Sequence, residues 1–139
     1  MTEFLNFLMQ HWLLASLTLF VIILLINLEL SSSARSLPAL DPQAAVILLN
    51  HNEALLLDLR PAPLFNEVHI AGSRNLPATE LINQLPHAKL SKKITLILVT
   101  ASGTIAKTDL KTLKNAGFTK LALLSGGIAA WREANFPLI

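Results

Sequence analysis

The sequence predicts an α/β domain in which helices flank both faces of a parallel sheet, preceded by one transmembrane helix. Three observations support this prediction. The N-terminal stretch is strongly apolar and lacks Lys and Arg. Short, continuous apolar runs of strand length follow farther along the chain. Segments with helical periodicity separate these runs, and strands that alternate with helices form parallel sheets covered on both faces.

The N-terminal apolar run covers residues 4–28 and contains no charged residue apart from whatever charge His11 carries. A hydrocarbon core of about 30 Å requires about 20 apolar helical residues, which this run supplies. A buried core helix is one alternative, but a small domain cannot surround such a segment. A cleaved signal peptide with a site at 32–34 is another, although the run exceeds the usual length of about 7–15 residues. We therefore expect an uncleaved anchor over residues 1–30.

The distribution of charge predicts the orientation of this anchor. All 11 Lys and Arg residues lie at or beyond Arg35, so the positive-inside rule places the C-terminal domain in the cytoplasm. Residues 31–37 are expected to form a short flexible linker. The basic residues beyond it are scattered, with few aromatic residues among them, which argues against a nucleic-acid partner. The expected partner of residues 4–28 is the lipid bilayer.

The remaining elements follow from local signals. Asp41 before Pro42 predicts the start of a helix that ends near residue 50, with Asp as the N-cap. Continuous apolar runs predict strands covered on both faces. These strands are expected at 54–59, 94–99 and 121–124, and further helices at 107–116 and 128–134.

The composition limits the possible chemistry. The chain contains no cysteine, which excludes disulfides, thiolate metal sites and thiol catalysis. None of the four histidines is spaced four residues from another, as two metal ligands on one helix face would be. We therefore expect neither a metal nor a cofactor.

Residues 55–77, LLLDLRPAPLFNEVHIAGSRNLP, resemble the signature of rhodanese-like domains. In that family an Asp-x-Arg at a strand end precedes a His-Ile-x-Gly segment, and here these positions are Asp58, Arg60 and His69–Gly72. The segment 116–131 is similar to the closing strand, Gly-Gly turn and Trp-bearing helix of the family.

The resemblance implies a rhodanese-like domain over residues 38–139. It is greatest to small rhodanese-like proteins of Gram-negative bacteria with one N-terminal membrane helix, which implies the bacterial inner membrane as the location.

One departure from the family pattern determines the expected function. Active rhodanese-like sulfurtransferases place a cysteine at the end of the fourth strand, and the resemblance aligns that cysteine with Thr100. A hydroxyl is a far weaker nucleophile at neutral pH, and its oxygen cannot carry a sulfane sulfur. We therefore expect no catalytic residue and no sulfurtransferase activity.

The loop after this strand is the candidate for a residual site. Its backbone N–H groups, which lead into a helix, could form an anion-binding nest. Alternatively, its hydroxyls only cap that helix. The resemblance implies that Asp58, Arg60 and His69 support the loop structurally. The candidate anion-binding loop comprises Thr100, Ala101, Ser102, Gly103, Thr104, Ile105 and Ala106.

The expected function is that of a catalytically inactive module. Tethered to the membrane, it would act as an adaptor or scaffold for an unidentified membrane or cytoplasmic protein. Two alternatives stay open: a sensor that binds an anion or a metabolite, and an enzyme of altered chemistry that uses residues 100–106.

Overall fold

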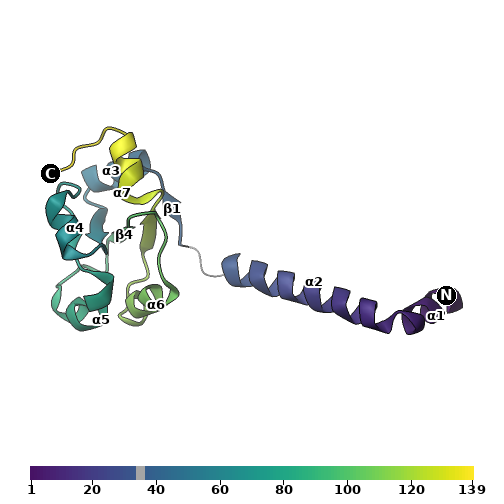
Figure 1. Ribbon diagram of the computed structural model, residues 1–139. Coiled ribbons are helices and arrows are strands. Elements are labelled where there is room, and N and C mark those ends of the chain that lie inside the picture. The colour runs from purple at the N-terminus through teal and green to yellow at the C-terminus, as the bar shows by residue number, and fades with distance from the viewer. Residues whose placement is uncertain (34–36) are drawn as a thin grey trace. The chain divides into compact units, whose positions relative to one another are not determined.

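The computed structural model describes residues 1–33 and 37–139, except for the side chains of residues 8 and 29–33 (Figure 1). The chain divides into two compact units, residues 1–36 and residues 37–139. Part of the predicted linker at 31–37 lies outside the described residues, and so do Arg35 and part of the alternative cleavage site. The helix of the first unit continues to Ser33, inside the range predicted as linker.

The first unit consists of α1 (Thr2–Gln10) and α2 (Trp12–Ser33). The apolar run at 4–28 is not one helix, because the backbone leaves the helical conformation at His11, with φ −120° and ψ 34°. In the part of the chain that the structure describes, no helix has the length and apolarity needed to span a membrane. The predicted transmembrane helix is therefore not supported.

The second unit contains a five-stranded, all-parallel sheet with the order β1-β5-β4-β2-β3. Its longest strands lie in the continuous apolar runs of the sequence, because helices cover both faces of the sheet and side chains on either face are buried. The parallel sheet predicted from the alternation of elements is thus confirmed. The strands are β1 (Ala39–Leu40), β2 (Ala54–Asp58), β3 (Arg74–Asn75), β4 (Thr95–Val99) and β5 (Leu121–Leu124).

Helices cover both faces of this sheet, with α3 and α7 on one side and α5 and α6 on the other (Figure 1). Helix α3 begins where the sequence predicts, because the backbone N–H of Ala44 donates to the Asp41 carboxylate at 2.7 Å. The helices are α3 (Pro42–Asn50), α4 (Ala62–Glu67), α5 (Leu81–Gln84), α6 (Lys107–Asn115) and α7 (Gly127–Glu133), with 3-10 turns at Ala78–Glu80 and Leu85–His87.

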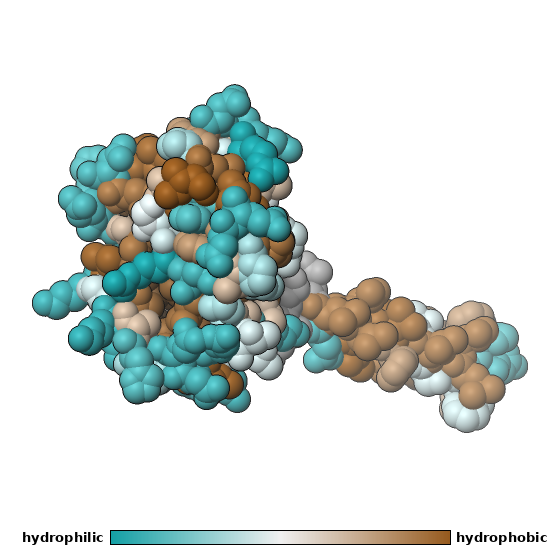
Figure 2. All heavy atoms as spheres, turned by 60° about the vertical axis from the view of Figure 1, so that its left-hand side comes forward, coloured by the Kyte–Doolittle hydropathy of each residue, from teal (hydrophilic) through white to brown (hydrophobic). Residues whose placement is uncertain are grey.

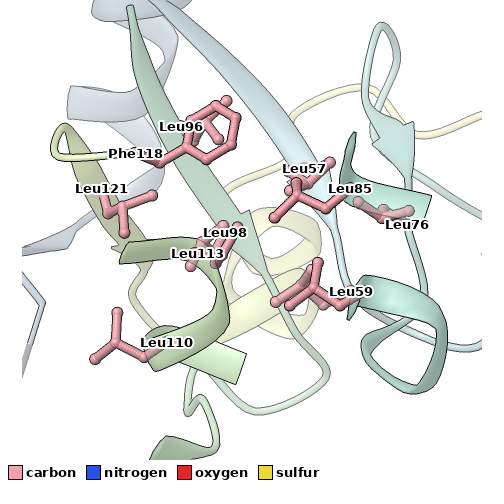
Figure 3. Packing of buried hydrophobic residues seen from close by; sticks show 11 residues of the cluster. Leu57, Leu59, Leu76, Leu85, Leu96, Leu98, Leu110, Leu113, Phe118 and Leu121 are labelled. Atoms are coloured by element: carbon pink, nitrogen blue, oxygen red, sulfur yellow. The ribbon is translucent and has the colours of Figure 1, made fainter. Parts of the chain in front are cut away.

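Successive side chains of the central strands point to opposite faces, which creates two apolar clusters. Leu96 and Leu98 of β4 join the cluster that includes Leu113 of α6 (Figure 3). Ile97 of the same strand joins the other cluster, with Trp131 of α7. The central strands are thus fixed from both sides.

Candidate functional site

The loop at residues 100–106 begins at the C-terminal end of β4, the middle strand of the sheet, and leads into α6. Because the strands are parallel, their C-terminal ends lie at one edge of the sheet. Asp58 at the end of β2 is therefore the register partner of Val99 at the end of β4. Sites in open parallel sheets lie at this edge.

The hydroxyl of Thr100 is bound within the loop itself. Its Oγ1 accepts a hydrogen bond from the backbone N–H of Gly103 at 2.9 Å. The hydroxyls of Ser102 and Thr104 lie 3.1 Å apart. Ala106 is the N-cap of α6, and no side chain caps that helix, so the alternative in which loop hydroxyls cap α6 is not supported. The Thr100 hydroxyl oxygen instead accepts the N–H of Gly103, one of the backbone donors of the candidate anion-binding loop.

The turn Gly126–Gly127 packs closely against this loop. The backbone N–H of Ile128 donates to the Thr100 carbonyl at 3.1 Å. A Cβ on Gly127 would overlap the same carbonyl oxygen, and a Cβ on Gly103 would lie 2.6 Å from the Gly126 nitrogen. The sequence indicated the Gly-Gly turn but not this contact, because the two segments are more than 20 residues apart.

Asp58 and Arg60 form a buried ion pair, with relative exposures of 0% and 6%. Arg60 Nη2 lies 2.8 Å from Asp58 Oδ2, and Nε lies 3.0 Å from Oδ1. Arg60 Nη2 also donates to the Val68 carbonyl at 2.8 Å. The Asn75 side chain donates to the carbonyls of both Asp58 and Arg60. Sequence reasoning missed Asn75, which no recognised motif marked.

His69 is held by α4 and by the end of the chain. Its Nδ1 lies 2.8 Å from the Phe65 carbonyl, and its ring stacks on Phe65 at 3.9 Å. Its backbone exchanges two hydrogen bonds with Ile139, beside an antiparallel bridge between Ile70 and Leu138.

Two of the residues predicted to support the loop lie at the same edge of the sheet as the loop, because Asp58 ends β2 and Arg60 follows it. Among the residues that the structure describes, however, no side-chain hydrogen bond of Asp58, Arg60 or His69 reaches residues 100–106. Asp58 and Arg60 instead join the end of β2 to Val68, and His69 contacts Phe65 of α4. Their support of the loop stays a prediction, as does anion binding by the loop.

The groups present allow little chemistry at this edge. The loop offers three hydroxyls and backbone amides, and it contains no charged side chain. Across residues 1–33 and 37–139, no group of three acidic or histidine side chains is placed to hold a metal ion. With no thiol anywhere in the chain, the loop can donate hydrogen bonds but cannot accept a sulfur atom.

Known proteins with the same fold are similar to this chain. A family model for the rhodanese-like domain matches residues 41–134. The uncharacterized protein YibN of Escherichia coli (strain K12) is 28% identical over 140 residues, which cover 100% of this chain and 98% of that protein. The thiosulfate sulfurtransferase GlpE of Ectopseudomonas mendocina is 34% identical over 89 residues, 64% of this chain and 79% of that protein.

Solved structures agree with the family match. The solution structure of the rhodanese-like domain of the Anabaena protein Alr3790 matches with a TM-score of 0.63 at 25% identity, over 73% of this chain and 78% of that chain. A thiosulfate sulfurtransferase from Pseudomonas aeruginosa shares the fold with a TM-score of 0.65 at 24% identity, over 79% of this chain and 21% of that chain. With its parallel sheet, flanking helices and family match, the chain belongs to the rhodanese-like domain family.

Proposed function

We propose that this chain is a catalytically inactive rhodanese-like module that acts as a protein-interaction adaptor or scaffold at the bacterial inner membrane, with its domain in the cytoplasm. One observation carries the proposal. The family model matches residues 41–134, yet the chain has no cysteine, and Thr100 follows the central strand where the family pattern puts the nucleophile.

Chemistry supports the inactive part of the proposal. In sulfur transfer a thiolate attacks the sulfane sulfur of thiosulfate, a new S–S bond forms, and sulfite leaves with the electron pair of the broken bond. A threonine hydroxyl remains protonated at neutral pH and forms no comparable bond to sulfur. The Thr100 oxygen is also already engaged by the N–H of Gly103.

Exposed apolar surface supports the membrane part. Along α1 and α2 the described large apolar side chains form an apolar surface (Figure 2). Their relative exposures include 64% for Trp12 and 63% for Phe20. A contiguous exposed apolar surface of this size marks a site of contact with a protein or a membrane. Lipid tails would bury it, and burial in lipid does not require α2 to cross the bilayer.

Flotation with lipid vesicles tests the membrane part. The full chain, mixed with neutral phosphatidylcholine vesicles, should float with them at high salt, because apolar burial is insensitive to screening. A variant with Leu17→Glu and Phe20→Glu in α2 should remain at the bottom of the gradient. Recovery of the unchanged chain free of lipid would contradict this part.

A sulfur-transfer assay tests the inactive part. The full chain with thiosulfate and cyanide should form no thiocyanate above the uncatalysed rate. The Thr100→Cys variant should gain one sulfur atom by mass spectrometry after exposure to thiosulfate, whereas Ser102→Cys, two residues along the loop, should not. Thiocyanate formation by the unchanged chain would refute the proposal. Equal sulfur uptake by both variants would show that position 100 is not the family's nucleophile position.

Cross-linking in living cells tests the adaptor part. A photoreactive residue placed on the domain surface at Ser102 or Lys111, at native abundance, should yield a discrete cross-linked protein at one position and not at both. Cross-links to many proteins in low yield, or none at any surface position, would contradict an adaptor role.

A further inference from the structure

The N-terminal edge of the sheet is the place where the chain enters the domain. We call it the entry edge and define it by the residues just before β2, β4 and β5, namely Glu53, Ile94 and Lys120. Backbone hydrogen bonds join two of these positions to β4: Thr95 N–H donates to the Glu53 carbonyl and Leu96 N–H to the Lys120 carbonyl, both at 2.9 Å. The chain comes in from this side before β1, and Leu123 N–H of β5 then donates to the Pro38 carbonyl at 2.8 Å. This edge is opposite to the loop at residues 100–106.

Lysines gather at the entry edge. Lys120 Nζ donates to the carbonyl of Lys93 at 3.0 Å. Lys92 Nζ lies 5.7 Å from the centroid of the Phe118 ring, just before β5. A cavity of about 320 Å³ is lined by Lys89 and Lys92 together with Phe118. Lys114 is in the last turn of α6, which runs towards this edge. The entry-edge lysines are therefore Lys89, Lys92, Lys93, Lys114 and Lys120, all exposed.

In the described part of the chain, none of the entry-edge lysines is paired with a carboxylate. Glu53 is the acidic residue among those that define the edge, whereas Asp41 and Asp58 lie at the C-terminal ends of β1 and β2, at the opposite edge. Within the described part of the chain, the ion pair present is Asp58–Arg60, and the five entry-edge lysines form none with the described acids. Their charge is free to attract an external anion.

We propose that the entry-edge lysines dock the domain onto the anionic headgroups of the same bilayer that covers the N-terminal helices. This inference rests on the membrane part of the proposed function. Three residues separate the end of α2 at Ser33 from Leu37, so a bilayer that covers α2 lies within the covalent reach of the entry edge. Lysines near an anionic membrane are attracted through its surface potential, which acts over about a Debye length.

This placement favours lipid over an acidic protein as the occupant. A soluble acidic partner could bind any basic surface, whereas the short covalent link keeps the headgroups of that bilayer within reach of the domain. Each lysine near an anionic surface changes the docking equilibrium by about fivefold at moderate ionic strength. Removal of two should therefore lower it by roughly 25-fold.

Single-cysteine labelling can test this geometry, because the chain contains no cysteine of its own. Thr119 and Ser125 are exposed and lie at the two ends of β5, roughly 20 Å apart along an extended strand. Thr119→Cys and Ser125→Cys are labelled with a donor dye in the full chain. The protein is reconstituted with vesicles that contain an acceptor dye on the headgroups, either in pure phosphatidylcholine or with phosphatidylglycerol added.

The proposal expects a higher transfer efficiency from position 119 than from position 125, in phosphatidylglycerol vesicles alone. The difference should vanish in about 0.5 M salt, where the Debye length is about 4 Å. It should also vanish in the Lys93→Gln/Lys120→Gln variant. The matched control, Lys107→Gln/Lys111→Gln, removes the same charge from the first residue and the middle of α6, farther from the entry edge than Lys114, and should retain the difference.

The outcomes separate the two proposals. If the chain floats with vesicles but positions 119 and 125 give equal transfer with either lipid, the docking inference is overturned and the membrane association stands. If the chain floats with neither vesicle, the membrane part of the proposed function fails. If soluble polyglutamate removes the difference at a concentration far below that of the lipid charge, the entry edge is a site for acidic proteins, and the lipid assignment is overturned.

Discussion

Removal of the buried Arg60 guanidinium is expected to destabilise the domain severely. In the Arg60→Met variant, the carboxylate of Asp58 would stay fully buried and lose every side-chain hydrogen bond from Arg60, while it keeps the backbone N–H of residue 60 at 2.9 Å. The Val68 carbonyl would also lose its donor. Breaking a buried pair in this way costs about 3–5 kcal/mol, which is a large part of the stability of a small domain.

Urea unfolding of the full chain in detergent measures this loss. Trp131 is buried and reports on the domain, and a Trp12→Phe background removes the other tryptophan signal. For a small domain the urea midpoint should fall by about 2–3 M. The control Lys111→Met introduces the same methionine side chain but removes an exposed cation, so it should leave the urea midpoint unchanged.

A second substitution tests the reason for the loss. Asp58→Asn keeps an acceptor for the backbone N–H of residue 60 but removes the buried charge. The double variant Asp58→Asn/Arg60→Met should therefore be more stable than Arg60→Met alone, because no unpaired charge is left in the interior. If the two single losses simply add, the pair does not act as a unit and the reasoning is refuted.

Two further predictions use the same unfolding measurement. Gly127→Ala should cost more than Gly72→Ala, because both glycines have positive φ but only Gly127 would place its Cβ against a backbone carbonyl. The conformational term alone is about 1–2 kcal/mol, so an equal loss in both variants would show that the Gly127 contact is not tight. Asp41→Ala should cost about 1 kcal/mol through the lost N-cap of α3, whereas Asp41→Ser should retain most of that stability. Equal effects of Ala and Ser would exclude the cap as the cause.

The elements with strong local signals were predicted well. Residues 121–124 match β5, and the apolar runs at 54–59 and 94–99 each extend one residue beyond the observed strand. Helix α3 was predicted because Asp41 and Pro42 mark a helix start by local chemistry alone. Such signals depend only on residues that are neighbours in the sequence, so they can be read from one sequence alone.

The missed elements lacked such signals. Strands β1 and β3 have two residues each, too few for any apolar pattern, and they exist because β5 and β2 offer them hydrogen-bonding edges. Helix α4 was missed because Pro61 and Pro63 indicated only a break, although proline is well tolerated in the first turn of a helix. The break at His11 likewise had no local signal in an apolar run.

The candidate site was predictable only in part. The Asp-x-Arg spacing marked Asp58 and Arg60, and the glycine pattern marked the loop. The bond from the Gly103 N–H to the Thr100 hydroxyl is local but had no sequence signal, whereas the contact of both residues with the 126–127 turn depends on long-range packing. No sequence pattern records distances between segments so far apart in the chain.

The sheet order also dictates when the protein can fold during synthesis. Within the described residues, β1 pairs with β5 alone, so Leu40 cannot pair until Leu124, 84 residues later, has been synthesised. At a translation rate of about 5–20 residues per second, this wait lasts roughly 4–17 s. The apolar helices leave the ribosome before any of these residues, so recognition of the N-terminal segment by the cell precedes closure of the sheet. A ribosome stalled before residue 121 would therefore hold a chain whose first strand is unpaired while its N-terminal segment is already accessible.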